Sequence, residues 1–190
     1  TITSVLRKCA QKIAAGESEK ISISASAVKQ LLGPEKVKPT FISRKDAVGI
    51  ANGLAWTSVG GEMLPVEVAI IPGGSGKIEI TGSLGDVMKE SAQLAISYAR
   101  VHAEKYGIAA DKLKTLDIHI HAPEGAVPKD GPSAGVTLTT ALISALSGYP
   151  VRHDLAMTGE ITLHGNVLPI GGLKEKSMAA YREGISTVLI

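Results

Sequence analysis

The sequence is short of cysteine, aromatic residues, net charge and long apolar runs. Cys9 is the only cysteine among 190 residues, so no disulfide can form within the chain, which suits the reducing cytoplasm. Aromatic residues make up 3% and the formal net charge is +2. Without a basic stripe or stacking aromatics, nucleic-acid binding is not expected. No apolar run approaches the roughly 18 residues of a membrane span, so no membrane segment is expected.

Apolar residues are nevertheless abundant, at 44% against 20% charged residues, which is typical of a folded domain with a buried core. The first forty residues have a helical character of their own. Their predicted elements are a helix at 4–15, a second helix capped by Ser24 or Ser26, a stop at Gly33-Pro34 and a linker at 36–40. We therefore expect a helical unit at 1–40 and a separate domain at 41–190.

The larger part predicts a mixed α/β (α+β) fold, because strands and helices interleave without strict repetition. Alternating apolar residues at 63–70 and 77–81 flank a glycine-rich turn and predict a β-hairpin. Ser83 to Asp86 resembles a capping box that opens a helix ending at Gly107. The remaining predicted elements are strands at 116–121, 155–158, 161–168 and 188–190, and a helix from Gly171-Gly172 to Arg182. The chain stops inside the last apolar run, so we expect a fragment of a longer protein.

Ser133 lies where an irregular loop turns into an apolar helix. The sequence around it reads PKDGPSAG at 128–135 and continues as the apolar run 136–143. Unpaired N–H groups and the helix dipole stabilise negative charge at such a position. Ser133 can therefore be a simple N-cap, an anion binder or a nucleophile.

A nucleophilic serine needs a base, and Lys176 is one candidate beside the histidines of the chain. With Leu173, Ser177 and Tyr181 on the apolar face of the last helix, Lys176 falls at the edge of that face, whereas Lys174 lies farther round. Burial would lower the pKa of Lys176 enough for it to act as a base. Spacing alone leaves open a serine cap and a solvent-exposed lysine.

Three segments resemble, in order, the motifs of the Lon family of ATP-dependent serine proteases. They are PKDGPSAG at 128–135, MTGEITL at 157–163 and VLPIGGLKEK at 167–176. The resemblance extends from about residue 47 to the end of the chain and implies the Lon proteolytic fold. It implies that Ser133 is the nucleophile and Lys176 the base of a Ser-Lys dyad.

The same resemblance implies the surroundings of the dyad. Thr158 would orient the lysine, and backbone N–H groups around Asp130 to Ser133, Gly131 among them, would form an oxyanion hole. The segment that contains Trp56, Thr57 and Ser58 would hold one edge of an extended substrate. The loop before Ser133, which begins at Pro128, would hold the other edge.

Four further residues have alternative interpretations. His119 and His121 share a strand face and could bind zinc, but no third ligand is evident, so we favour a polar face beside the site with a supporting role for His119. Asp130 could pair with Lys176 in an inactive state or stabilise its loop. Glu160 could be a surface carboxylate of a hairpin or, as the resemblance implies, a supporting residue of the site.

The first forty residues resemble the end of the helical lid of an AAA+ ATPase. Gly73 to Lys77 is not a Walker A motif, so no cofactor is expected for this chain, and ATP and Mg²⁺ would belong to the full-length enzyme. The resemblance implies a cytoplasmic homo-hexamer that degrades unfolded, misfolded and selected regulatory polypeptides in stress response and quality control. The alternatives are a small-molecule kinase, a non-catalytic Lon-like assembly domain and a processing protease without a motor.

Overall fold

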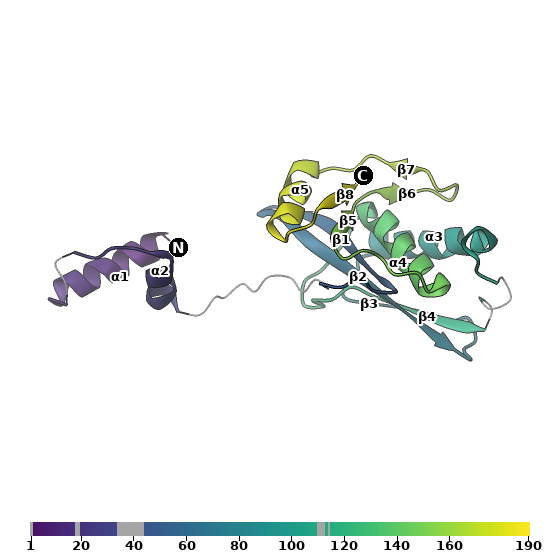
Figure 1. Ribbon diagram of the computed structural model, residues 1–190, viewed down its shortest axis with the longest axis horizontal. Coiled ribbons are helices and arrows are strands. Elements are labelled where there is room, and N and C mark those ends of the chain that lie inside the picture. The colour runs from purple at the N-terminus through teal and green to yellow at the C-terminus, as the bar shows by residue number, and fades with distance from the viewer. Residues whose placement is uncertain (1, 18–19, 34–43, 110–112, 114) are drawn as a thin grey trace. The chain divides into compact units, whose positions relative to one another are not determined.

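The computed structural model describes residues 2–17, 20–33, 44–109, 113 and 115–190. It divides into two compact units, Thr1–Pro39 and Thr40–Ile190 (Figure 1). The predicted linker at 36–40 lies outside the described residues. Within those residues, every helix is too short or too polar to cross a membrane.

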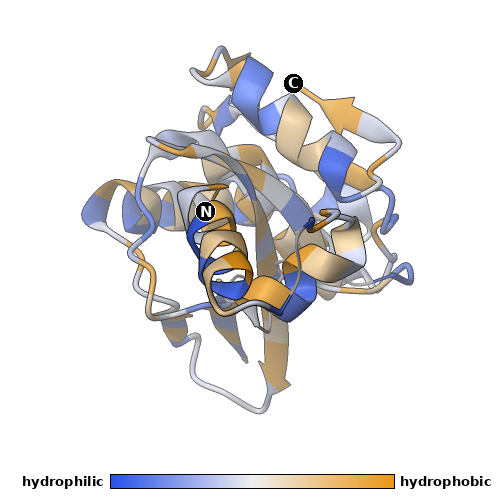
Figure 2. Cartoon of the chain, turned by 90° about the vertical axis from the view of Figure 1, so that its left-hand side faces the viewer, coloured by the Kyte–Doolittle hydropathy of each residue, from blue (hydrophilic) through white to orange (hydrophobic). Residues whose placement is uncertain are grey.

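The first unit contains two helices, α1 (Ile2–Ala14) and α2 (Ala25–Leu32). Ser24 caps α2, because its side chain accepts a hydrogen bond from the N–H of Ala27 at 3.2 Å. The helices bury one small apolar cluster, and Figure 2 shows polar and apolar residues side by side along the N-terminal helix. Both predicted helices are confirmed, and the serine cap is Ser24.

The second unit is built on a six-stranded mixed sheet in the order β3-β4-β2-β1-β5-β8. The pairs β1–β2 and β2–β4 are antiparallel, and β3–β4, β1–β5 and β5–β8 are parallel. The strands are β1 (Ile50–Thr57), β2 (Gly60–Pro72), β3 (Ile78–Thr81), β4 (Leu116–His121), β5 (Leu155–Met157) and β8 (Thr187–Leu189). The mixed α/β class is confirmed.

The predicted hairpin between 63–70 and 77–81 is wrong, because β4 lies between β2 and β3. The Asp117 carboxylate at the start of β4 accepts hydrogen bonds from the N–H groups of Ser75 and Lys77, at 2.8 and 2.7 Å. These bonds hold the turn after β2 against the start of β4, and β3 then pairs with β4 rather than with β2. The hairpin partner of β2 is β1, whose last residue, Thr57, pairs with Gly60.

Two helices, α3 (Asp86–Val101) and α4 (Gly135–Ser147), cover one face of the sheet over the main apolar core. The predicted capping box is wrong, because α3 has Gly85 as its N-cap and no side-chain cap from Ser83. Ser83 adopts φ 55° and donates its hydroxyl to the Gly125 carbonyl instead. The helix ends at Val101, and a 3₁₀ turn, η1 (Ala103–Tyr106), precedes Gly107.

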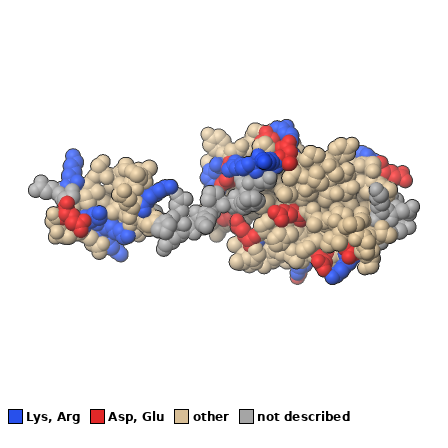
Figure 3. Space-filling view, turned by 60° about the horizontal axis from the view of Figure 1, so that its bottom comes forward, with Lys and Arg blue, Asp and Glu red and all other residues tan. Residues whose placement is uncertain are grey.

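The other face carries α5 (Leu173–Arg182) over a small apolar cluster. The predicted strand at 161–168 is two strands, β6 (Glu160–Ile161) and β7 (Val167–Leu168), which form a separate two-stranded sheet. The N–H of Thr162 donates to the Asn166 carbonyl and closes the turn between them. Figure 3 shows acidic and basic side chains near one another around a largely uncharged surface on one face of the second unit.

Candidate active site

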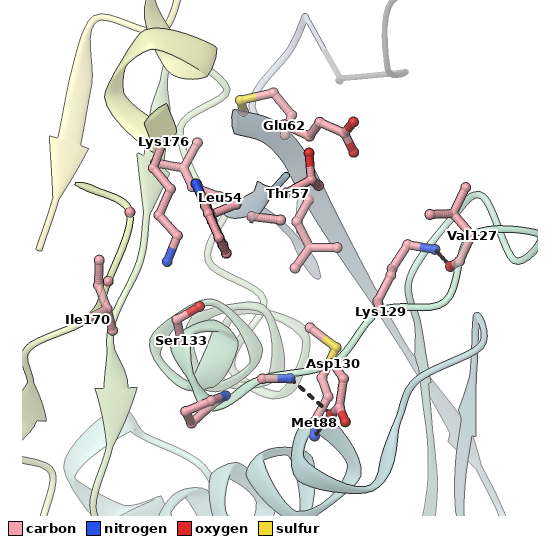
Figure 4. Close-up of a pocket in the computed structure, with 18 of the residues that line it drawn as sticks. Leu54, Thr57, Glu62, Met88, Val127, Lys129, Asp130, Ser133, Ile170 and Lys176 are labelled. Carbon is pink, nitrogen blue, oxygen red and sulfur yellow. Dashed lines mark hydrogen bonds between the residues drawn. The ribbon is translucent and has the colours of Figure 1, made fainter. Parts of the chain in front are cut away.

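A pocket of about 660 Å³ lies at the carboxyl end of β1, where the loop before α4 and the start of α5 meet (Figure 4). Ligands of open α/β sheets commonly bind at the carboxyl ends of strands. The predicted site residues that line the pocket are Trp56, Thr57, Pro128, Asp130, Gly131, Ser133, Glu160 and Lys176. Residues far apart in the sequence therefore meet in one cavity.

Ser133 lies in a 3₁₀ turn, η3 (Pro132–Ala134), directly before α4. Ala134 is the N-cap residue of α4 and Ser133 makes no side-chain cap, so the simple N-cap interpretation is wrong. Two donors fix the Ser133 carbonyl, namely the Gly159 N–H at 2.9 Å and the Thr158 hydroxyl at 3.3 Å. The Ser133 hydroxyl is left on the pocket side of this turn.

Lys176 is more buried than the helical spacing predicted, with 3% of its surface exposed. The predicted apolar face was misplaced, because Tyr181 is 80% exposed and the buried positions of α5 are Lys176, Ala179 and Ala180. Lys176 therefore lies within the buried face, and Lys174 is exposed. Burial lowers the pKa of the Lys176 amine below its ordinary value, because the charged form loses its hydration.

Thr158 connects the lysine to the serine turn. The Lys176 amine donates to Thr158 Oγ1 at 3.0 Å, and that hydroxyl donates to the Ser133 carbonyl. Thr158 is 1% exposed and follows β5 directly. Figure 4 shows the Lys176 amine extending from α5 toward Ser133 at the start of α4. One buried hydroxyl therefore orients both the amine and the backbone of the serine.

Asp130 stabilises its own loop and the start of α3. Its Oδ1 accepts hydrogen bonds from the N–H groups of Met88 and Gly131, both at 2.9 Å. This arrangement matches the loop-stabilising interpretation, and the carboxylate is not paired with Lys176. Because the Gly131 N–H is bonded to Asp130, it is not free as an oxyanion donor in this conformation. A Cβ on Gly85 would overlap the Asp130 carboxyl group, so the contact requires glycine there.

Lys129 is a structural residue that the sequence did not reveal. Its amine donates to the carbonyls of Glu124 and Val127 at 2.7 and 3.0 Å, and burial lowers its pKa. The amine thereby holds the loop that leads to Ser133. Its partners are backbone carbonyls, which leave no pattern of side chains in the sequence.

His119 and Ser58 are not among the residues that line the pocket. His119 lies on β4, where its Nε2 is 2.9 Å from the Thr81 hydroxyl, and His121 Nδ1 is 2.7 Å from the same oxygen. Within the described residues, no three His, Cys, Asp or Glu side chains are placed to hold a metal ion. Glu160 lines the pocket from β6.

The chain is similar to known proteins over most or all of its length. Residues 22–190 match the family model described as the Lon protease (S16) C-terminal proteolytic domain. The Lon protease of Clostridium acetobutylicum is 53% identical over 189 residues, which cover 100% of this chain and 24% of the relative. That of Geobacter metallireducens is 56% identical over 189 residues, covering 100% and 23%. The chain therefore spans about a quarter of the length of these relatives.

Proposed function

The chain belongs to the Lon protease (S16) family and is a serine-type peptidase, and we propose that Ser133 and Lys176 are its catalytic dyad. One observation carries this proposal: a buried amine with a lowered pKa extends toward a serine whose side chain makes no N-cap hydrogen bond. A lysine has an ordinary pKa of about 10.4, so only a desolvated lysine is neutral often enough to accept a proton.

The proposed mechanism has two halves. In the first, Ser133 Oγ attacks the peptide carbonyl carbon while its proton passes to Lys176 Nζ. The tetrahedral intermediate collapses when Lys176 returns that proton to the leaving amine and the C–N bond breaks. In the second half, water attacks the ester carbonyl carbon while Lys176 accepts its proton, and the ester C–O bond then breaks as Lys176 returns that proton to Ser133 Oγ. Hydrogen bonds of this kind commonly tighten only when substrate binds, which fits an amine that donates to Thr158 in the free protein.

The shape of the pocket supports an extended polypeptide as the substrate. Trp56 and Thr57 form one side at the end of β1, and the loop from Pro128 to Gly131 forms the other. A chain held between two backbone segments is bound through main-chain hydrogen bonds, which demand little of its sequence. Unfolded, misfolded and selected regulatory proteins are the proposed substrates.

The proposal for the longer protein follows from the family alone. Because the chain covers about a quarter of its relatives, ATP and Mg²⁺ are assigned to a part outside it. We assign the first unit to the end of an AAA+ lid, and we propose a cytoplasmic homo-hexamer that acts in protein quality control and stress response.

Cleavage of a short unstructured fluorogenic peptide tests the dyad. Ser133→Ala and Lys176→Ala are each expected to lower kcat by about 10³-fold or more, because nucleophile and base act as one unit. Lys174→Ala is the matched control, since that lysine is exposed on the same helix. Full retention of cleavage in either dyad variant, or an equal loss in the control, would remove the assignment.

A further inference from the structure

Gly61 lies against the backbone of α5 at the residue that carries the buried amine. A Cβ built on Gly61 would lie 2.9 Å from the backbone nitrogen of Lys176 and would overlap the carbonyl group of Glu175. Ordinary contacts of a Cβ begin at about 3.4 Å. All three contacted atoms belong to the helix backbone, so no side-chain rotation can relieve the overlap. The missing side chain of Gly61 therefore fixes how deeply α5 lies at Lys176.

A second contact joins the same two segments. Arg182, at the end of α5, donates from Nη2 to the Gly61 carbonyl at 2.8 Å. Gly61 itself is buried and pairs with Trp56 of β1, which lines the pocket. The start of α5 adds a third contact, because a Cβ on Gly172 would lie 2.8 Å from the Cβ of Trp56. The helix thus rests on the end of the β1–β2 hairpin at both of its ends.

We infer that Gly61 is a positioning residue for Lys176, which it holds at the depth where the amine reaches Thr158 beneath the serine turn. The inference rests on the proposed dyad and adds to it a residue that touches neither substrate nor the reacting atoms. Figure 4 shows Lys176 descending from α5 beside the start of β2, where Glu62 follows Gly61. Gly61 does not adopt a positive φ, so backbone conformation does not account for glycine at this position.

The effect of a side chain at Gly61 has a definite direction. The helix backbone has to retreat from β2 by roughly 1 Å or more to restore ordinary contact. Among the described residues, the outer side of α5 is open, with Met178 56% and Tyr181 80% exposed, so the helix can move outward. Outward movement draws the amine of Lys176 away from Thr158 and toward water. Misplacement of a catalytic group by 1 Å costs about 10²-fold in rate.

Nearby charged groups are not the cause of the lowered pKa of the Lys176 amine. The charged groups that share its pocket are Glu62 of β2, Glu160 of β6, and Glu124, Lys129 and Asp130 of the loop before Ser133. Lys174, Glu175 and Arg182 are the nearest charges on α5 itself. Desolvation by burial is the cause of the lowered pKa of Lys176. The depth at which α5 holds the side chain therefore determines how readily the amine loses its proton.

The test is Gly61→Ala in the full chain, with Gly125→Ala as the matched control. Gly125 also lacks a positive φ, and a Cβ there meets only one atom, at 4.0 Å. Competitive acetylation of Lys176 by acetic anhydride across a pH series, read by peptide mass spectrometry, reports the titration of the amine without needing catalysis. We expect Gly61→Ala to raise the pKa of Lys176 toward its ordinary value and to lower kcat by about 10²-fold. Gly125→Ala should change neither.

If Gly61→Ala does not fold, Arg182→Gln tests the same inference. It removes the hydrogen bond to the Gly61 carbonyl without adding bulk, and a smaller upward shift of the same titration is expected. A folded Gly61→Ala chain with the titration and kcat of the control would overturn the inference, as would an Arg182→Gln chain with an unmoved titration. If wild type cleaved no peptide but the titration still shifted, the proposed function would fail while the role of Gly61 would stand.

Discussion

The two faces of the central sheet are covered in very different ways. Among the described residues, α3 and α4 cover a cluster of seventeen buried apolar residues, whereas α5 covers a cluster of four on the opposite face. Burial of apolar area is the main source of folding free energy, at about 25 cal/mol per Å². The α3–α4 face therefore supplies most of the stability of the sheet. The α5 face instead holds a desolvated amine through a few close backbone contacts.

An energetically unfavourable group can be held in the site because another part of the domain stabilises the fold. A buried charge-bearing amine destabilises the element that carries it, and the large core on the other face offsets that cost. Ser133 belongs to the well-packed side through α4, and Lys176 belongs to the lightly packed side through α5. The dyad forms where the two sides meet at the carboxyl end of β1.

The largest expected effect on stability comes from a cavity in the core beneath α3 and α4. Leu142 of α4 is fully buried, so Leu142→Ala should lower the free energy of unfolding by about 3 kcal/mol through the cavity it leaves. At temperatures where the variant stays folded, kcat should remain within about twofold, because α5 and its contacts are untouched. Urea denaturation and peptide cleavage on the same preparations measure both. A loss of kcat as large as that expected for Gly61→Ala would contradict the division between the faces.

The next largest effect is expected on kcat, from loss of the Thr158 hydroxyl that links Lys176 of α5 to the turn of Ser133. Thr158→Val keeps the shape but removes the partner of the Lys176 amine and the donor to Ser133, so kcat should fall by about 10- to 100-fold with little change in KM. Thr139→Val is the matched control, since Thr139 donates to the Gly135 carbonyl within α4. Equal losses in the two variants would show that Thr158 acts only as packing.

The residues of the candidate site were easier to recognise in the sequence than the order of the strands. Ser133, Lys176 and Thr158 lie in contiguous motifs, and burial of Lys176 rather than Lys174 follows from helical periodicity even though the predicted face was misplaced. The order β3-β4-β2 could not be read, because it depends on Asp117 meeting a turn about forty residues earlier in the chain. A local alternation of apolar and polar residues indicates a strand but does not determine which strand pairs with it.

The roles of glycine and of backbone partners were equally hidden. Asp130 caps α3 from a remote loop, whereas the local pattern pointed to Ser83. Gly61 has no side chain to show a pattern, and its importance comes from the helix that packs on it. Such contacts depend on tertiary distances, which spacing along the chain does not encode.

A smaller effect should appear as a gain in stability. Lys176→Met removes the desolvated amine, and we expect the free energy of unfolding near neutral pH to rise by about 1 kcal/mol. The folded pKa is lowered, so the cost of the charge is full below that pKa, declines as pH rises, and vanishes above about 10.4, where the unfolded lysine is neutral too. Denaturant titrations at neutral and alkaline pH measure the gain. A gain that grows toward alkaline pH would contradict a lowered folded pKa.

The smallest expected effect concerns the loop on the serine side. Asp130→Ala removes the acceptor of the Met88 N–H and should lower the free energy of unfolding by about 1 kcal/mol, as loss of a helix cap does. The same change frees the Gly131 N–H. Thermal melts give the stability, with Asp86→Ala as a control at an exposed carboxylate of the same helix. Equal melting temperatures for Asp130→Ala and wild type would show that the cap contributes nothing.

The pH dependence of kcat/KM for an unstructured peptide tests the lysine base most directly. A Lys176 that must lose its proton predicts a rate that rises with pH through one ionisation below the ordinary lysine pKa of about 10.4. The rise should be unchanged in Lys174→Ala, and cleavage should be lost in Lys176→Ala. A flat profile from mildly acidic to alkaline pH, or the wild-type profile in Lys176→Ala, would contradict catalysis by this amine.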